Sequence, residues 1–391
     1  MRFPVGVLLG SLTFAATVTP AAGPRDASPG TDHRLQTRLS APAPAAAPDW
    51  VKQWRMELSG RDFDSRETST KLVNFRFDLQ LKYRLSEDVL LKIAPAARLQ
   101  SGATQSSDGR LSPENKIYFR EASALWRAGS FALLKAGALD MGETHSPLLL
   151  DPRPFPAARA QISYGDGDWR LSLLAEGAVP TTVGLNTNQG EKEPTPVFQS
   201  YSLRHDWKSG PLWKGMLRAG AFAFSALPTS LANDSRLLGN TVDTVSDTES
   251  RFRERYAGVE AQGELRFPLP GPVDGRLRAS HVRNTSAPDG FNQASQFAAD
   301  LTWRWDTRRD LLLGAEAFRA EPDAAVASFV QDAYSGTNRA GYRVDAGIAF
   351  GKRKAARLVG GAGESQLIYQ NSPQSRERFV IMKLETDYAD F

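Results

Sequence analysis

One stretch, residues 71–85 with the sequence KLVNFRFDLQLKYRL, alternates strictly between apolar and polar side chains. From Val73 to Leu85 every odd position is apolar and every even position is polar or charged. Because successive side chains of a β-strand point to opposite sides of a sheet, this period of two predicts a strand with one apolar face. The stretch is far longer than the usual strand of about 5 to 6 residues. A strand that crosses a bilayer has this pattern, with lipid on one side and a wet lumen on the other.

The alternation recurs through the rest of the chain, with differing regularity. The predicted strands are residues 54–59, 71–85, 89–100, 115–127, 131–139, 157–164, 169–179, 197–207, 212–226, 257–267, 273–284, 296–305, 310–320, 342–350, 355–370 and 378–391. Their number is about 16, in a range of 14 to 18, and single-chain bacterial barrels have an even number of strands. The sequence therefore predicts an all-β fold, a transmembrane antiparallel up-and-down β-barrel.

Residues 115–127 depart from the alternation, because the charged residues Arg120 and Glu121 are adjacent. Neighbouring side chains of a regular strand point to opposite faces, so only one of the two could face a polar lumen. A β-bulge, which adds one residue to a strand, would let both face the same way. We therefore expect a bulge in this strand.

The connections between the predicted strands alternate in length. The short ones are residues 86–87, 128–129, 166–167, 208–210, 269–271, 307–308 and 352–353. The others, mostly long, are residues 61–70, 101–114, 140–156, 181–196, 227–250, 285–291, 322–336 and 371–377. Outer-membrane barrels have short periplasmic turns and longer extracellular loops. The asymmetry thus predicts both a barrel and its orientation.

Aromatic residues gather beside the short turns and at the C-terminal end. The predicted periplasmic girdle consists of Tyr83, Trp126, Trp169, Trp207, Trp305 and Tyr388. Tyrosine and tryptophan prefer the headgroup level of a membrane, which explains why they would collect at one end of each strand.

The N-terminus has the pattern of an exported protein. A basic residue, Arg2, precedes an apolar run at residues 5–18, and small residues follow at 19–22. This predicts a signal peptide over residues 1–22, because the run is short for the roughly 20 residues of a spanning helix. Residues 23–50 are rich in proline and alanine, which predicts a disordered or extended linker. The barrel is expected over residues 51–391.

Composition excludes several classes of function. The chain has 391 residues and no cysteine, so disulfides, thiol catalysis and thiolate metal sites are ruled out. A net charge of +4 without a clustered basic patch argues against nucleic acid as a partner. No phosphate-binding loop, dinucleotide fingerprint or zinc motif is present, and we expect neither cofactor nor metal.

The signal peptide, the alternation, the loop asymmetry and the terminal aromatic Phe391 together resemble the Gram-negative outer-membrane porin class. Within it, residues 135–137 and the proline-rich segment 151–156 are similar to the specific and alginate-export type porins. The resemblance implies a water-filled outer-membrane channel for passive diffusion of small hydrophilic solutes. It also implies outer-membrane lipids and the barrel-assembly machinery as partners, with Phe391 in the assembly signal, and allows a homotrimer.

The resemblance further implies that the third long loop, residues 140–156, folds into the lumen. The loop carries Asp140, Glu143, Asp151 and Arg153 as candidate constriction residues, and three leucines at 148–150 that could pack against the wall. Candidate pore-lining residues on the opposite wall are Arg76, Lys82, Arg84 and Arg98. An acidic loop facing a basic wall would create a transverse field that favours polar solutes. Alternatively, these charges merely solvate the lumen and its mouth.

Two other classes compete with the channel. A barrel enzyme of lipase or protease type needs a Ser/His or Asp/His cluster, and His281 lies near Ser280 and Asn284. This invites comparison with outer-membrane phospholipases, but their His-x-Ser-Asn-Gly order is absent. No pair among the four histidines has metal-ligand spacing. A closed structural or adhesion barrel is the third class, and it predicts no conductance.

Overall fold

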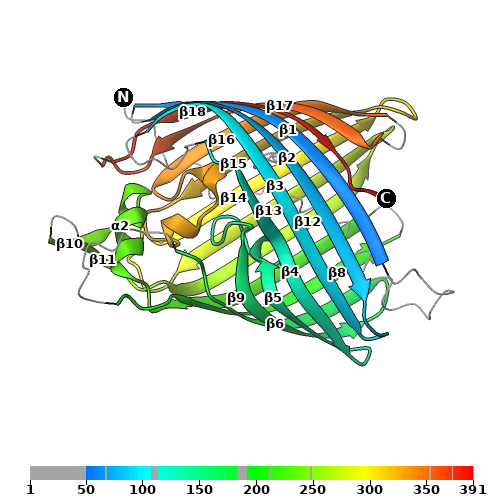
Figure 1. Ribbon diagram of the computed structural model, residues 1–391, viewed down its shortest axis with the longest axis horizontal. Coiled ribbons are helices and arrows are strands. Elements are labelled where there is room, and N and C mark those ends of the chain that lie inside the picture. Colours follow the sequence, from blue (N-terminus) through cyan, green and yellow to red (C-terminus); the bar gives the residue numbers. More distant parts are fainter. Residues whose placement is uncertain are drawn as a thin grey trace.

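The computed structural model describes residues 50–66, 68–106, 113–182, 192–210, 213–246, 249–351, 354–371 and 373–390. In these residues sixteen strands, β1–β9 and β12–β18, form one closed antiparallel barrel (Figure 1). Each barrel strand pairs with the next along the chain, β9 pairs with β12, and β18 pairs with β1 to close the wall. The predicted all-β up-and-down barrel and its strand number are confirmed.

The barrel strands differ widely in length. Their bounds are β1 Trp50–Ser65, β2 Thr68–Arg84, β3 Val89–Ser106, β4 Lys116–Ala128, β5 Ala132–Asp140, β6 Pro154–Gly165, β7 Trp169–Ala178, β8 Val197–Ser209, β9 Trp213–Ser225, β12 Ala257–Leu269, β13 Val273–Asn284, β14 Gln293–Arg304, β15 Asp310–Ala320, β16 Arg339–Phe350, β17 Ala356–Leu367 and β18 Glu377–Thr386. A two-residue strand, β19 Ala389–Asp390, continues the pairing with β1.

Other elements lie in the connections. They are the 3-10 turns η1 Met141–Glu143, η2 Ala327–Phe329 and η3 Asp332–Tyr334, the helix α2 Thr229–Leu237, and the hairpin of β10 Val242–Ser246 and β11 Glu249–Phe252. Within the described ranges, no helix is long and apolar enough to cross a membrane.

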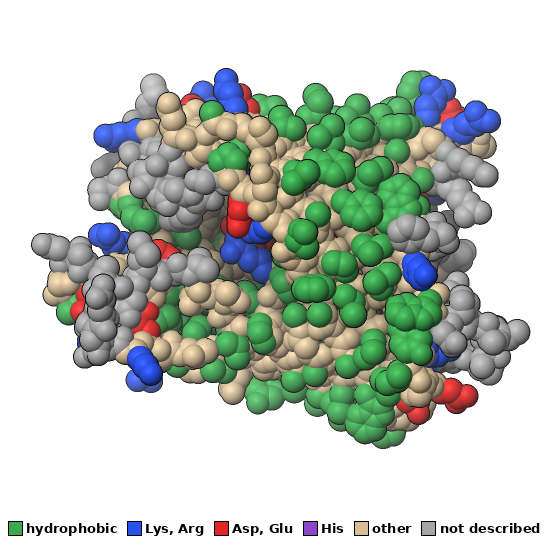
Figure 2. All heavy atoms as spheres, viewed as in Figure 1, with side chains coloured by type: hydrophobic (Ala, Val, Ile, Leu, Met, Phe, Trp, Pro, Cys, Tyr) green, Lys and Arg blue, Asp and Glu red, His purple; other side chains and the backbone are tan. Residues whose placement is uncertain are grey.

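The two faces of the wall follow the alternation of the sequence. On β2, Val73 points outward and is 56% exposed, whereas Arg76 points inward and is 2% exposed. Figure 2 shows hydrophobic side chains over the outer wall, with charged side chains mainly at the two ends and in one hollow. Each strand thus presents an apolar face outward and a largely polar face to the interior.

The predicted bulge in β4 is present. The pairing of β3 with β4 shifts between Ala94 and Pro95, which lie opposite Glu121 and Phe119. Arg120 is the extra residue, and its Nη1 lies 3.4 Å from Oδ2 of the inward-facing Asp78. Glu121 also faces inward and is buried. The bulge therefore turns both charges toward the lumen.

Deleting Arg120 is expected to leave the barrel folded, with a regular strand β4. Without the extra residue, Phe119 and Glu121 become neighbours and keep their partners Pro95 and Ala94, so Ile117 and Phe119 still face outward. The measurement is gel mobility of the refolded protein with and without boiling, which should still differ. Arg120→Gln keeps the bulge and removes only the charge beside Asp78, so it is the matched control. Loss of the gel shift in the deletion variant alone would contradict this register.

Some predicted boundaries are wrong. The long loop predicted at residues 61–70 is instead a tight hairpin, because β1 extends to Ser65 and β2 begins at Thr68. The mixed composition of this segment resembles a loop, but β18 and β3 flank the hairpin and satisfy its backbone groups. The strand β3 likewise extends to Ser106, within the predicted loop 101–114. The predicted loop 227–250 contains α2 and β10, which the sequence did not indicate.

The chain ends are only partly described. The first strand begins at Trp50, one residue before the predicted start of the barrel. The predicted signal peptide and the rest of the linker lie outside the described residues, as does Phe391. These assignments stay predictions.

The aromatic residues predicted for the girdle lie at the short-turn end of the strands. Trp126, Trp169 and Trp305 are exposed, while Tyr83, Trp207 and Tyr388 are half-buried. Several stand beside another aromatic ring, as in the pair Trp50 and Tyr83, whose centroids are 4.6 Å apart. Their contact with a membrane interface remains a prediction.

Candidate functional site: the inward-folded loops

The loop between β5 and β6, residues 141–153, folds into the barrel and is called the third loop below. It starts where Oδ1 of Asp140 accepts a hydrogen bond from the Gly142 amide at 2.9 Å, which caps η1. It then reaches strands far along the sequence, since Oγ of Ser146 lies 2.9 Å from Oγ of Ser280 on β13. The third loop therefore crosses part of the lumen.

His145 fixes the third loop to the wall. Its Nε2 lies 2.9 Å from Oε1 of Glu176 on β7, and its Nδ1 lies 3.0 Å from Oε2 of Glu260 on β12. The His145 side chain is fully buried. Ionised carboxylates only accept hydrogen bonds, so this geometry suits an imidazole that donates from both nitrogens and carries a positive charge. The Ser146 amide also donates to Glu260, which adds a second attachment at the same strand.

An acidic residue of the third loop does meet a basic wall. Glu143 accepts a hydrogen bond from Nζ of Lys135 at 2.7 Å and from Nη1 of Arg159 at 2.9 Å. Nζ of Lys92 lies 3.8 Å from its other oxygen. Sequence reasoning missed these three cations, although each occupies an inward position of its strand. Which part of the wall Glu143 faces was not predictable from its position in the chain.

The predicted wall residues are placed differently from one another. Arg76 is buried and pairs with Glu57 and Asp78 at 3.2 Å and 3.0 Å. Lys82 is buried, and Arg84 is exposed at the end of β2. Arg76 thus meets carboxylates of β1 and β2, and the role of these wall residues in a constriction stays a prediction.

Asp151 and Arg153, the remaining predicted residues of the third loop, join it to the connection between β15 and β16. Arg153 pairs with Asp151 and, through Nη2 at 2.7 Å, with Asp332 in the connection between β15 and β16. The carboxylates of Asp332 and Asp151 raise the pKa of the half-exposed Arg153 guanidinium, although partial desolvation opposes them. The backbone adds two bonds, from the Asp151 amide to the Phe329 carbonyl at 2.6 Å and from the Gln331 amide to the Pro147 carbonyl at 3.0 Å.

A hydrophobic core lies inside the barrel. Leu148, Leu149 and Leu150 of the third loop are fully buried. They belong to a cluster with the wall residues Phe155, Ala178, Phe198, Phe222, Phe224, Val282, Ala294 and Ala320, and with Met141, Leu231, Tyr256, Ala324, Ala325, Val326, Phe329, Val330 and Tyr334 of the connections. The three leucines therefore pack against both the wall and other inward-folded segments, as the sequence allowed.

Parts of three connections form what we call the plug: the third loop, residues 321–338, and residues 226–241 with 252–256. Nδ2 of Asn240 donates to the Ala325 carbonyl at 2.9 Å, and Oδ1 of the same side chain accepts from the Ala327 amide at 2.7 Å. Asp323 accepts hydrogen bonds from the Thr241 amide at 2.9 Å and the Tyr256 hydroxyl at 3.1 Å. Burial raises the pKa of Asp323 despite these donors. Nothing in the sequence indicated these contacts.

The described residues include two Ser/His pairs, and neither has the organisation of a catalytic site. Oγ of Ser200 lies 3.4 Å from Nε2 of His145, but that nitrogen is engaged more closely by Glu176 and the group is buried. On the outer face, Nδ1 of His281 lies 2.8 Å from Oγ of Ser295. In the described part of the chain no carboxylate hydrogen-bonds to His281, so the third member of a triad is missing. Those residues also include no group of His, Asp and Glu that could hold a metal ion.

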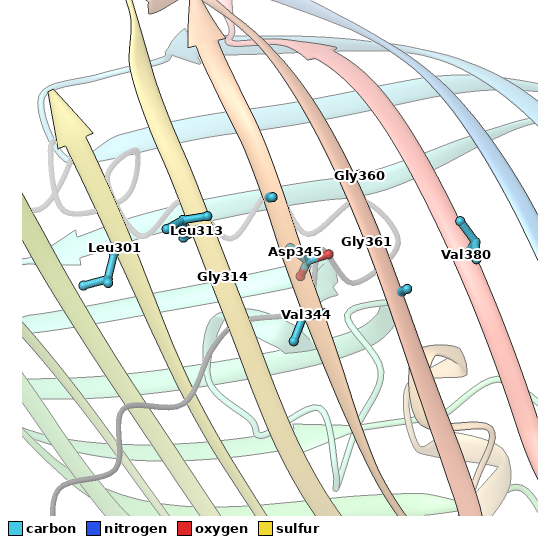
Figure 3. A pocket seen from close by; sticks show the side chains of 10 residues that line it. Leu301, Leu313, Gly314, Val344, Asp345, Gly360, Gly361 and Val380 are labelled. Carbon is cyan, nitrogen blue, oxygen red and sulfur yellow. The ribbon is translucent and has the colours of Figure 1, made fainter. Parts of the chain in front are cut away.

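A hollow of about 590 Å³ lies in the outer wall over β14–β18 (Figure 3). Its lining is mostly apolar or glycine, with Leu301, Leu313 and Val380 among the larger side chains. The one charged lining residue, Asp345, is paired with Nη2 of Arg343 at 2.7 Å. This hollow therefore offers a polar solute no unpaired charge, and the polar interior of the barrel is the better candidate site.

Comparison with models of known protein families and with curated protein sequences finds no match. Solved structures do match in fold. The high-pH structure of OprB from Pseudomonas putida has a TM-score of 0.54 and 13% sequence identity, over 86% of this chain and 93% of that chain. A loop-deletion mutant of OmpT, an outer membrane protein of Vibrio cholerae, has a TM-score of 0.48 and 10% identity, over 87% and 100%. OpdQ of Pseudomonas aeruginosa has a TM-score of 0.46 and 11% identity, over 88% and 100%.

Proposed function

We propose that this chain, which has the fold of the Gram-negative outer-membrane porin class, forms a channel for passive diffusion of small hydrophilic solutes. The observation that carries the proposal is the two-faced wall. Apolar side chains such as Val73 face outward, and charged ones such as Arg76, Lys92 and Arg159 face the interior. A charged interior in an apolar shell suits water and polar solutes inside a membrane.

In this proposal the plug narrows the channel rather than sealing it. Glu143 lines one side of the passage, where the third loop meets Lys135 and Arg159. The basic side chains of β2 and β3, among them Arg76 and Arg98, line the other. Solutes would then be selected by the width left beside the plug and by the charge of these walls.

The enzyme alternative is disfavoured by the geometry of the Ser/His pairs. Substrate could not reach the buried His145, and no carboxylate of the described ranges hydrogen-bonds to His281. A phospholipid substrate could still meet the outward-facing pair of His281 and Ser295. The test is phospholipid ester hydrolysis by the folded protein. Hydrolysis by the wild type that is lost in Ser295→Ala would show that the protein is an enzyme and would contradict the channel proposal.

The membrane setting is part of the same proposal. The short turns face the periplasm and the long loops face the cell exterior. The aromatic residues near Trp126 and Trp305 contact the lipid headgroups. Lipids of the outer membrane and the barrel-assembly machinery are then the partners, and assembly as a homotrimer is compatible with this fold. Chemical cross-linking of the folded protein in detergent reports the oligomeric state, and a monomer only would remove the trimer from the proposal.

The channel is tested by reconstitution of the refolded protein in a planar lipid bilayer. Stepwise current increases are expected, because a water-filled passage conducts ions as soon as one barrel inserts. Protein that shifts in gel mobility on boiling serves as the folded sample, and boiled protein as its control. Folded protein that inserts without conducting would leave the closed structural barrel as the better explanation.

A further inference from the structure

Three basic residues lie side by side on the inner wall. In the pairing of β2 with β3, Arg76 stands directly opposite Arg98, and in the pairing of β3 with β4, Arg98 stands directly opposite Lys116. Like charges placed opposite each other on neighbouring strands destabilise a sheet. The repulsion within such a row is offset when carboxylates, water or a bound anion compensate the positive charges.

Two of the three charges are compensated within the chain. Arg76 pairs with Glu57 and Asp78, and Nζ of Lys116 lies 2.5 Å from Oε2 of Glu114. Arg98 differs from both. In the ranges that the structure describes, it forms no ion pair, and its guanidinium lies over the ring of Tyr118, with Cζ 5.6 Å from the centroid. Its Nε is buried without a hydrogen-bond partner.

The surroundings of Arg98 suit an incoming anion. The residue is half-buried, so part of the guanidinium remains accessible from the interior. The ring of Tyr118 is also approached by Nζ of Lys116, at 5.9 Å from the centroid, so two cations converge on one aromatic ring. A guanidinium presents parallel N–H donors that match the two oxygens of a carboxylate or phosphate. The nearby charges of Arg76 and Lys116 add to the positive potential at this position.

We propose that Arg98, supported by Lys116 and Tyr118, is an oxyanion-binding subsite on the path through the barrel, for solutes that carry a carboxylate or phosphate group. The proposal deepens the channel function and rests on it. An anion at Arg98 supplies the partner that the described residues do not provide. Solutes with this group are then drawn to the β2–β4 wall and pass along it.

The first test is ion selectivity under a KCl gradient. Wild-type channels are expected to prefer chloride, and Arg98→Gln should lower the chloride-to-potassium permeability ratio by about threefold, since it removes an uncompensated charge next to the passage. Arg308→Gln removes the same charge from the exposed turn between β14 and β15 and should leave the ratio unchanged. Equal effects of the two variants would mean that net charge alone matters, which overturns the subsite.

The second test uses inorganic phosphate as the probe. Phosphate should reduce the chloride current of the wild type, and Arg98→Lys should keep the selectivity but bind phosphate about tenfold more weakly, because lysine lacks the bidentate fork. If Arg98→Lys binds phosphate as tightly as the wild type, the geometry of the guanidinium has no role and the subsite is wrong.

A binding measurement separates this proposal from the channel itself. Broadening of the ³¹P resonance of phosphate by folded protein in detergent reports binding without any conduction. Broadening that Arg98→Gln abolishes supports the subsite even if the barrel does not conduct. A conducting channel whose phosphate signal is the same in wild type and Arg98→Gln keeps the proposed function but removes the subsite. Both variants must first show the gel shift of the folded barrel.

Discussion

Replacing His145 by alanine is expected to detach the third loop from the wall while the barrel remains folded. The substitution leaves Glu176 and Glu260 without their shared partner in a buried position. Removing one member of such a buried charged group costs about 3 to 5 kcal/mol. Because the contacts are confined to the third loop, the cost falls on the attachment of that loop and less on the strands.

The measurement for His145→Ala is single-channel conductance in a bilayer. The current should be larger and noisier than in the wild type, because a mobile third loop leaves a wider and fluctuating passage. His205→Ala is a matched control, since His205 is an outward-facing residue of β8 beside Trp207. A quiet channel of wild-type conductance in His145→Ala, with the gel shift intact, would show that the hydrophobic core alone holds the loop.

Replacing Leu149 by alanine is expected to loosen the plug from its apolar side. Leu149 is fully buried in a core that combines the third loop, the wall and the connection that contains Phe329. Truncating a buried leucine to alanine costs about 2 to 5 kcal/mol, through lost burial and the cavity that remains. Amide hydrogen exchange within residues 141–153 should accelerate, because their protection depends on this packing.

The control for Leu149→Ala is Leu313→Ala, on the outer face of β15. Leu313 is 56% exposed in the chain alone, and it has no contact with the plug. The same change of side chain there should leave exchange in residues 141–153 unaltered. If both variants accelerate exchange equally, the protection of the third loop arises from the barrel as a whole and not from the core around Leu149.

The wall could be predicted from the sequence because its pattern is local. The alternation that places Val73 and Arg76 on opposite faces follows from strand geometry alone, whatever the neighbouring strands are. The bulge at Arg120 was predictable for the same reason, because two adjacent charges cannot share one face of a regular strand. The end of β1 could not be predicted, because its polar residues form strand hydrogen bonds only once the neighbouring strands are in place.

The plug could not be predicted in detail because its contacts depend on the closed barrel. Glu176 and Glu260 look like any inward charges of their strands, and only closure brings both to His145. The leucines at 148–150 were recognisable as apolar residues in need of cover, but their partners lie in connections with no regular pattern. The sequence likewise gave no reason to single out Lys135 and Arg159 as the cations that meet Glu143.

The attachment of the third loop has a consequence for the order of assembly. The contact of His145 with Glu260 joins residues 115 positions apart, that of Ser146 with Ser280 joins residues 134 apart, and that of Arg153 with Asp332 joins residues 179 apart. Contacts of such sequence separation form late, because the chain between them must first be ordered. The third loop can dock only after β12 and β13 have entered the sheet. A barrel still under assembly is therefore expected to have an open interior, and its narrow section is the last part to form.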